Sequence, residues 1–326
     1  MAKGKAGKVA GVIGLGSMGI GVARTLLSKG VTVYAYDVRP QVLKDFAHEG
    51  GKACSSPAEV GANASVVVVL VVNAQQTQDV LLGANGAAER MAKGSVAICS
   101  ATVAPAIAED LGAKLKAKGI HMLDAPVSGG AARAATGQLS IMASGAREAF
   151  TGAQSVLDVI AAKVYRLGDA PGMGSKVKMI NQLLAGVHIA ASAEAMALGI
   201  RAGVDPNVLY EVISNSAGSS WMFQNRVPHI LAGDYTPLSA VNIFVKDLGI
   251  VLDAARQSTF PLPLTATAHQ MFLMAGAHGL GGEDDSAVVK VFQTISGIPL
   301  PEKKRAPRAK AKAGAPAKAK AARKRG

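Results

Sequence analysis

The chain has 326 residues, 49% of them hydrophobic, and is therefore long and apolar enough for more than one packed domain. Its formal net charge of +13 belongs to the two ends: 1–8 and 302–326 hold 14 Lys or Arg and one acid, which leaves 21 basic and 21 acidic residues between them. The longest purely apolar run, 66–72, is too short to span a bilayer, and the only cysteines, Cys54 and Cys99, are predicted to be reduced core thiols rather than a disulfide framework.

The first predicted elements are a strand over 8–13 and a helix that ends near Lys29, and the turn between them is Gly14-Leu15-Gly16-Ser17-Met18-Gly19. In a dinucleotide-binding turn of this pattern, the first glycine makes the tight bend, the second lets a pyrophosphate approach the backbone, and the third packs helix on strand. A second strand, 31–36, ends in Asp37, and an acid there binds the adenosine ribose and repels the 2′-phosphate of NADP. We predict NAD as the cofactor, with Arg39 as a residue that could instead accommodate NADP.

Strands and helices then alternate as far as residue 123, with strands at 65–72, 95–100 and 120–123 and helices at 41–49, after Gln75 and at 105–118. This alternation predicts an α/β fold, a Rossmann-type doubly wound parallel sheet in a domain over 1–170. Ligands bind at the carboxyl ends of such strands, so Val72, Asn73 and Thr102 are candidate cofactor contacts. An ordinary turn or helix cap is the alternative for each.

Another polar turn, Ser128-Gly129-Gly130, follows the strand that ends before Asp124, and its backbone amides and hydroxyl suit an anion. A simple turn explains the same residues equally well. Late strands are predicted near 141–143 and 163–166, and they would close the first domain.

A long helix is predicted over 171–204, with Ser175 as its N-cap. Beyond its first turns it has almost no polar face, so it should be buried on all sides. Lys178, Asn181 and Gln182 lie at i, i+3 and i+4 and share one face. A lysine on a buried helix is either functional or reaches solvent through its long stem.

The remainder, 205–301, is predicted to be an all-α domain, with helical patterns at 206–215, 242–257, 263–277 and 285–296. One of these patterns contains the charged pair Lys246-Asp247. The segment 302–326 mixes Lys, Arg, Ala, Pro and Gly without hydrophobic periodicity, which predicts a disordered basic tail. Such a tail could make weak contact with nucleic acid, or it could be a solvated extension without a partner.

Taken together, these motifs resemble the β-hydroxyacid dehydrogenase family, the group that contains 3-hydroxyisobutyrate dehydrogenase and tartronate semialdehyde reductase. The likeness covers about 9–301 and rests on four motifs: the glycine turn, Asp124-Ala-Pro-Val-Ser-Gly-Gly130, Gly172-x-Gly174-x-x-x-Lys178-x-x-Asn181, and Lys246-Asp247-Leu248. The chain departs from the family at Val22, Thr25 and Gln182, where Met, Asn and a second Asn are common, and these changes affect packing or fine positioning.

The resemblance implies a site, in which Lys178 is the catalytic acid/base and Asn181 orients the substrate. By the same resemblance, Ser128, Gly129 and Gly130 bind the substrate carboxylate, while Thr102 and Lys246 contact the cofactor. It implies no metal. A lysine is a poor base at neutral pH, because its ordinary pKa is near 10.4, so burial and a second cation such as Lys246 are expected to lower it.

Four segments narrow the likeness to family members that oxidise a four-carbon sugar acid: 188–198, 219–226, 233–249 and 283–292. Ser219, Trp221 and Asn225 are the candidate residues for substrate selection. Another small hydroxy acid, such as 3-hydroxyisobutyrate or glycerate, is the enzymatic alternative; a nucleic-acid-associated protein that uses the fold as a scaffold is the non-enzymatic one. A homodimer or homotetramer is expected, because the long apolar helix needs cover and the resemblance implies such an assembly. The cytoplasm is the default location.

Overall fold

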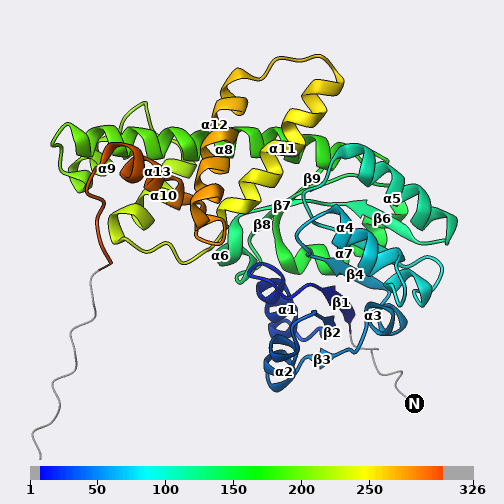
Figure 1. Cartoon of the computed structure of the whole chain (residues 1–326). Coiled ribbons are helices and arrows are strands. Elements are labelled where there is room, and N and C mark those ends of the chain that lie inside the picture. Colours follow the sequence, from blue (N-terminus) through cyan, green and yellow to red (C-terminus); the bar gives the residue numbers. More distant parts are fainter. Residues whose placement is uncertain (1–7, 304–326) are drawn as a thin grey trace, which may run out of the picture.

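Short, mostly apolar segments form the larger sheet of the computed structural model, which describes residues 8–303 (Figure 1). Its six strands pair in parallel in the order β3-β2-β1-β4-β5-β6, which confirms the doubly wound sheet. The strands are β1 (Val9–Ile13), β2 (Thr32–Tyr36), β3 (Lys52–Ala53), β4 (Val66–Val69), β5 (Val96–Cys99) and β6 (His121–Asp124). The predicted strand over 65–72 is shorter than expected, because the chain leaves the sheet after Val69 and exposes Val72.

Helices cover both faces of this sheet, since its strands are apolar on both sides. They are α1 (Gly19–Ser28), α2 (Pro40–His48), α3 (Pro57–Asn63), α4 (Ala74–Leu82), η1 (Ala87–Glu89), α5 (Pro105–Ala117) and α7 (Arg147–Ile160). One core contains Leu26 of α1 and Phe150 of α7, and the other contains Leu111 of α5. Both cysteines are buried and free, as predicted.

A second, smaller sheet follows, with the order β7-β8-β9. It consists of β7 (Val127–Ser128), β8 (Leu139–Ala143) and β9 (Ala161–Arg166), and the short α6 (Gly130–Ala134) lies between the first two. The predicted late strands therefore exist, but they form a separate sheet in which β7 runs antiparallel to β8.

The long helix α8 (Met173–Arg201) leads from the strand-containing part into the helical part (Figure 1). Its N-cap is Gly172 and not Ser175, so that prediction was wrong: Ser175 lies inside the first turn, where its hydroxyl bonds to Asp124. By length and composition alone, α8 is apolar enough to cross a membrane. It packs against five helices of the chain's end, but Ile180, Leu184 and Leu198 stay exposed, so within one chain the helix is not buried on all sides as predicted.

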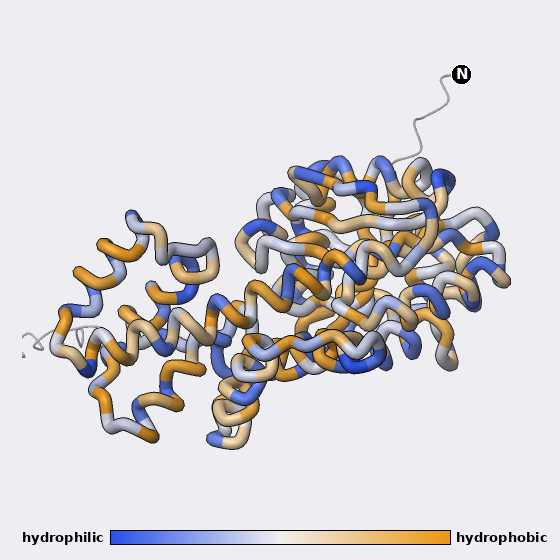
Figure 2. Tube along the Cα trace, turned by 90° about the horizontal axis from the view of Figure 1, so that it is seen from above, coloured by the Kyte–Doolittle hydropathy of each residue, from blue (hydrophilic) through white to orange (hydrophobic). Residues whose placement is uncertain are grey.

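The remaining elements are helices, as predicted: α9 (Pro206–Ser214), α10 (Trp221–Ala232), α11 (Val241–Gln257), α12 (Pro263–Ala275), η2 (Gly276–Leu280), η3 (Asp285–Val288) and α13 (Val289–Ser296). Seen from above, they lie to one side of the sheets, and hydrophobic residues recur along them (Figure 2). Sequence reasoning missed α10, because it contains Pro228. Most of the predicted tail, 304–326, lies outside the described residues.

Candidate active site

The start of α8 lies against the loop that follows β6, and this contact buries Lys178. The lysine side chain is 7% exposed, and its Nζ donates a hydrogen bond to the carbonyl oxygen of Val127 at 2.9 Å. The alternative that this lysine reaches solvent is therefore wrong. Lys176, two residues earlier, is exposed and faces Glu109.

Burial lowers the pKa of Lys178 from its ordinary value to about 8. Two charged groups of α11 act in opposite directions: the Asp247 carboxylate raises this pKa and the Lys246 ammonium lowers it. Desolvation is the largest effect, because the ammonium form loses water that a single carbonyl does not replace. A substantial fraction of the amine is neutral slightly above pH 7.

A chain of polar contacts joins α8, α11 and the end of β5. Asn181 donates to Gln182 at 3.0 Å, and Gln182 donates to Asp247 Oδ2 at 2.6 Å. Lys246 Nζ lies 2.6 Å from Asp247 Oδ1 and donates to the carbonyl oxygen of Thr102 at 3.1 Å. Asp247 is almost fully buried, and its charge is balanced by the Lys246 ammonium and the hydrogen bond from Gln182. The structure thus brings together Lys178, Asn181, Lys246 and Thr102 from the predicted site.

The Ser128-Gly129-Gly130 turn follows Val127 directly and is therefore next to the carbonyl that Lys178 contacts. Gly129 and Gly130 have φ angles of 129° and 69°, which non-glycine residues rarely adopt. A Cβ at Gly130 would meet no atom within 4 Å, so this side of the turn is open. The turn can accept a small anionic group beside the lysine.

The glycine turn after β1 has the geometry that a dinucleotide needs. Gly14 has a φ of 91°, a Cβ at Gly19 would lie 1.8 Å from the Gly14 carbonyl oxygen, and a Cβ at Gly16 would meet open space. No side chain caps the start of α1, so no side chain competes with a pyrophosphate for the amides of this turn, although the Ile20 amide donates to the Gly16 carbonyl. Ser17 and Met18 complete the turn. The residues present fit NAD.

Asp37, at the end of β2, is buried and closely tied to this turn. Its carboxylate accepts hydrogen bonds from the Leu15 amide at 2.7 Å and from the backbone and guanidinium of Arg39 at 2.8–2.9 Å. Burial raises the pKa of Asp37, but these hydrogen bonds outweigh it and the net shift is downward. The group stays charged, and Arg39 is engaged with it rather than free for a phosphate.

For two other predicted cofactor residues, Asn73 and Val72, the structure does not distinguish a cofactor contact from an ordinary structural role. Asn73 is the N-cap of α4 and accepts from the Gln76 amide at 2.9 Å, which matches the cap alternative. Val72 is 53% exposed at the same edge of the sheet. Both lie where the chain leaves β4, so a cofactor above the sheet can still reach their backbone.

Ser219, Trp221 and Asn225 do not lie near Lys178 in one chain, and their role in substrate selection stays a prediction. Ser219 precedes α10 and the other two lie in its first turns, and Phe223 of the same helix packs on Met196 near the other end of α8. Met196 lies 18 residues after Lys178, roughly 27 Å away at a helical rise of about 1.5 Å per residue. Trp221 is also 54% exposed, whereas its neighbours Met222 and Phe223 are buried.

Sequence reasoning assigned no role to two buried carboxylates of the site, Asp124 and Asp247. A charged residue within the apolar pattern of α11 is a sequence feature that could have marked Asp247 as functional. The position of Asp124 at the end of a strand is a weaker indication of the same kind. In the part of the chain that the structure describes, no three His, Cys, Asp or Glu side chains are grouped as a metal site.

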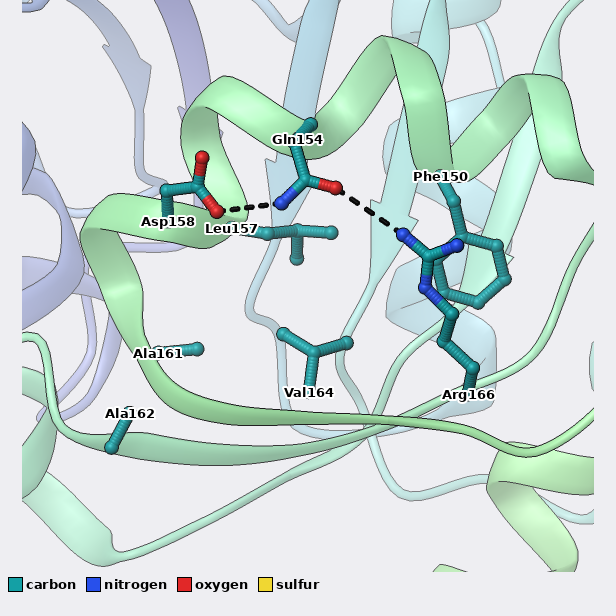
Figure 3. A pocket seen from close by; sticks show the side chains of 8 residues that line it. All are labelled: Phe150, Gln154, Leu157, Asp158, Ala161, Ala162, Val164 and Arg166. Carbon is teal, nitrogen blue, oxygen red and sulfur yellow. Dashed lines mark hydrogen bonds between the residues drawn. The ribbon is translucent and has the colours of Figure 1, made fainter.

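A hollow of about 270 Å³ lies elsewhere, between α7 and β9 (Figure 3). Arg166 lies over the Phe150 ring at 4.7 Å and donates to Gln154, which in turn donates to Asp158. The polar groups that line this hollow pair with one another at the surface, and Lys178 is not among its lining residues. We therefore assign no chemistry to the hollow.

Comparison with known proteins gives matches over nearly the whole described chain. Residues 9–168 match the NAD binding domain of 6-phosphogluconate dehydrogenase, and residues 172–292 match the NAD-binding model of NADP-dependent 3-hydroxyisobutyrate dehydrogenase.

Among curated proteins, the chain is 66% identical to the L-threonate dehydrogenase of Cupriavidus necator, over 90% of this chain and 98% of the relative. It is 50% identical to that of Haemophilus influenzae, over 90% and 96%. Among solved structures, 3-hydroxyisobutyrate dehydrogenase from Salmonella typhimurium is 50% identical with a TM-score of 0.83, over 87% of this chain and 99% of that one.

Proposed function

This chain belongs to the β-hydroxyacid dehydrogenase family, the group of 3-hydroxyisobutyrate dehydrogenase, and we propose that it oxidises L-threonate with NAD to the 2-oxo acid, 2-oxo-tetronate. It is an NAD-dependent oxidoreductase that acts on CH–OH groups. The observation that carries the proposal is Lys178: a buried amine with a pKa near 8, next to an open anion-binding turn.

Lys178 acts as the general base in this proposal. Its neutral Nζ takes the proton of the C2 hydroxyl while the hydrogen at C2 leaves with both electrons. NAD supplies the hydride acceptor when bound. In the reverse direction the ammonium returns the proton to the carbonyl oxygen. The Val127 carbonyl holds the amine in place, and burial keeps its pKa within reach of physiological pH.

The neighbouring residues orient the substrate. The amides and hydroxyl of Ser128, Gly129 and Gly130 bind its carboxylate, and Asn181 binds a hydroxyl from the same helix face as Lys178. Gln182 holds Asp247, which in turn holds Lys246 near Thr102. Lys246 thus reaches from α11 to Thr102, which follows the carboxyl end of β5, where the nicotinamide end of the cofactor is expected.

The cofactor is held along the carboxyl ends of β1, β2 and β4. The pyrophosphate is bound by those amides of the turn 14–19 that are not used by Tyr36 and Asp37, while Asp37 binds the adenosine ribose and Val72 and Asn73 border it. A 2′-phosphate would face the charged carboxylate of Asp37, whose pairing with Arg39 removes the nearest cation from that role.

Membership of the family does not identify the substrate, because two relatives at 50% identity are named for different substrates. The test is a panel of small hydroxy acids, including 3-hydroxyisobutyrate and glycerate, with NAD and with NADP. We expect the highest kcat/KM for L-threonate with NAD. A site that pairs several hydroxyls loses hydrogen bonds when a methyl-bearing analogue enters. A higher kcat/KM for 3-hydroxyisobutyrate would contradict the substrate, and an equal use of NADP would contradict the role of Asp37.

We also propose that the chain assembles with copies of itself in the cytoplasm. On α8 the side chains of Ile180, Leu184 and Leu198 are 51–68% exposed. With the exposed Ala191 and Ala195 they form one stripe at helical spacing. An apolar stripe of this length favours burial in an interface. The nucleic-acid alternative has less support, because a scaffold does not need a desolvated lysine at a dinucleotide site.

A further inference from the structure

One buried carboxylate near the site has no role in the reaction described above. Asp124, the last residue of β6, is 1% exposed and lies one loop before Ser128. A buried carboxylate is unfavourable unless donors surround it. Its partners therefore show what it is for.

All the donors come from the start of α8 or from Ser144. Oδ2 accepts from the Gly172 amide at 2.9 Å, from the Ser175 amide at 2.8 Å and from the Ser144 hydroxyl at 3.4 Å. Oδ1 accepts from the Ser175 hydroxyl at 2.7 Å. Ser144 in turn accepts from the Gly174 amide at 2.9 Å. Asp124 and Ser144 thus satisfy three amides that a helix start leaves without partners.

The start of α8 is shaped for this close approach. Gly172 has a φ of 115°, and a Cβ on Gly174 would lie 2.4 Å from the Met142 carbonyl oxygen and 2.5 Å from that of Asp124. A side chain at Gly174 would therefore push the helix away from β6. Two glycines and a carboxylate together hold the first turn of α8 on the end of the sheet.

Lys178 follows this turn on the same face, three residues after Ser175. Its Nζ contacts Val127, three residues after Asp124. The loop 124–127 therefore holds α8 at two points, the backbone through Asp124 and the amine through Val127. If the first turn moves, the amine cannot keep its contact with the carbonyl.

We propose that Asp124 is a positioning residue for the dehydrogenase reaction: it holds the first turn of α8 so that the Lys178 amine stays buried beside the carboxylate-binding turn. This inference rests on the proposed function only through the role of Lys178. The charged groups that face Lys178 are Asp247 and Lys246 of α11, and neither contacts Asp124.

The test compares Asp124→Ala with Asp124→Asn. The alanine removes every acceptor, whereas the asparagine oxygen can take the place of Oδ2 and its NH₂ can donate to the Ser175 hydroxyl. We expect kcat to fall by about 10²-fold in Asp124→Ala, the loss that a displacement of about 1 Å produces, and to fall far less in Asp124→Asn. The pH midpoint of kcat/KM should rise in Asp124→Ala, because the amine gains water.

A second readout does not depend on turnover. Acetylation of Lys178 by acetic anhydride over a range of pH, followed by mass spectrometry, measures the pKa of the amine without substrate. We expect a higher pKa in Asp124→Ala than in the wild type and little change in Asp124→Asn. If the wild type is inactive on threonate but the pKa of Lys178 is still higher in Asp124→Ala, the substrate assignment fails and the positioning role of Asp124 stands.

Asp284→Ala is the matched control. Asp284 is also fully buried and also accepts from two backbone amides, those of Ser286 and Leu238, but it lies in the helical part. Its removal should lower stability without moving the pKa of Lys178. If Asp124→Ala does not fold, Ser144→Ala decides. It removes the acceptor of the Gly174 amide and one long hydrogen bond to Asp124, but it leaves the bonds of Asp124 to Gly172 and Ser175, so it should raise the pKa of Lys178 by a smaller amount. An unchanged pKa of Lys178 in the folded variants would overturn the proposal.

Discussion

The two halves of α8 differ in how they are held, although one continuous helix carries both. In the first half, Lys178 and Gln182 are buried and hydrogen-bonded, to Val127 and Asp247 respectively. In the second half, small and apolar residues dominate, and Leu198 is 68% exposed. The first half is positioned by directional hydrogen bonds, which suits chemistry. The exposed apolar stripe, which starts at Ile180 and lies mostly in the second half, offers non-directional apolar area, which suits assembly.

The strongest way to break this comparison is to remove the amine. Lys178→Ala should lower kcat by about 10²–10⁴-fold, the usual contribution of a general acid–base group, while the Kd for NADH stays near that of the wild type. Lys176→Ala is the control, because that side chain is exposed and faces Glu109 at 3.3 Å. Equal losses in the two variants would mean that the burial of Lys178 has no functional meaning.

The second test adds charge to the exposed apolar stripe of α8, which begins at Ile180 in the first half and continues to Leu198 in the second. Leu184→Glu combined with Leu198→Glu should convert the assembly to monomers in sedimentation at micromolar concentration, because an interface would bury two unpaired carboxylates. Leu264→Glu is the control, since Leu264 is a similarly exposed leucine on α12. A wild-type chain that already sediments as a monomer would contradict the proposed interface.

The smallest expected effect is a shift in pH dependence. The rate of oxidation should rise with pH and level off above about 8, because the neutral form of Lys178 is the base and its pKa is near 8. Reduction should show the opposite trend, since it needs the ammonium. Asp247→Asn should move the midpoint of oxidation to lower pH, because the Asp247 carboxylate raises the pKa of Lys178.

Lys246→Met supplies the opposite change. Its ammonium lowers the pKa of Lys178, so its loss should move the midpoint upward. Both profiles are measured at saturating NAD, because Lys246 also lies near the proposed cofactor site. Shifts in the same direction for the two variants would show that the charges of α11 do not act on Lys178 directly.

Several features could be predicted because their cause is local in the chain. The valine-rich runs and the turn 14–19 have the periodicity and glycine spacing of a parallel nucleotide-binding sheet, so the fold and the family followed from the sequence. The face shared by Lys178 and Asn181 follows from helical spacing alone. Asp37 could be identified by its place at the end of the second strand.

Other features depended on contacts between distant segments. Ser175 has the composition of an N-cap, but Asp124, 51 residues earlier, takes its hydroxyl and lets the helix begin before it. Trp221 has the composition of a substrate contact, but the length of α8 carries it away from Lys178 of the same chain. The environment of Lys178 is also non-local: the loop after β6 buries the amine, and the charged residues of α11 shift its pKa. Spacing along the sequence determines which side chains share a face, whereas only the packing of remote elements determines which of them lose water and change their pKa.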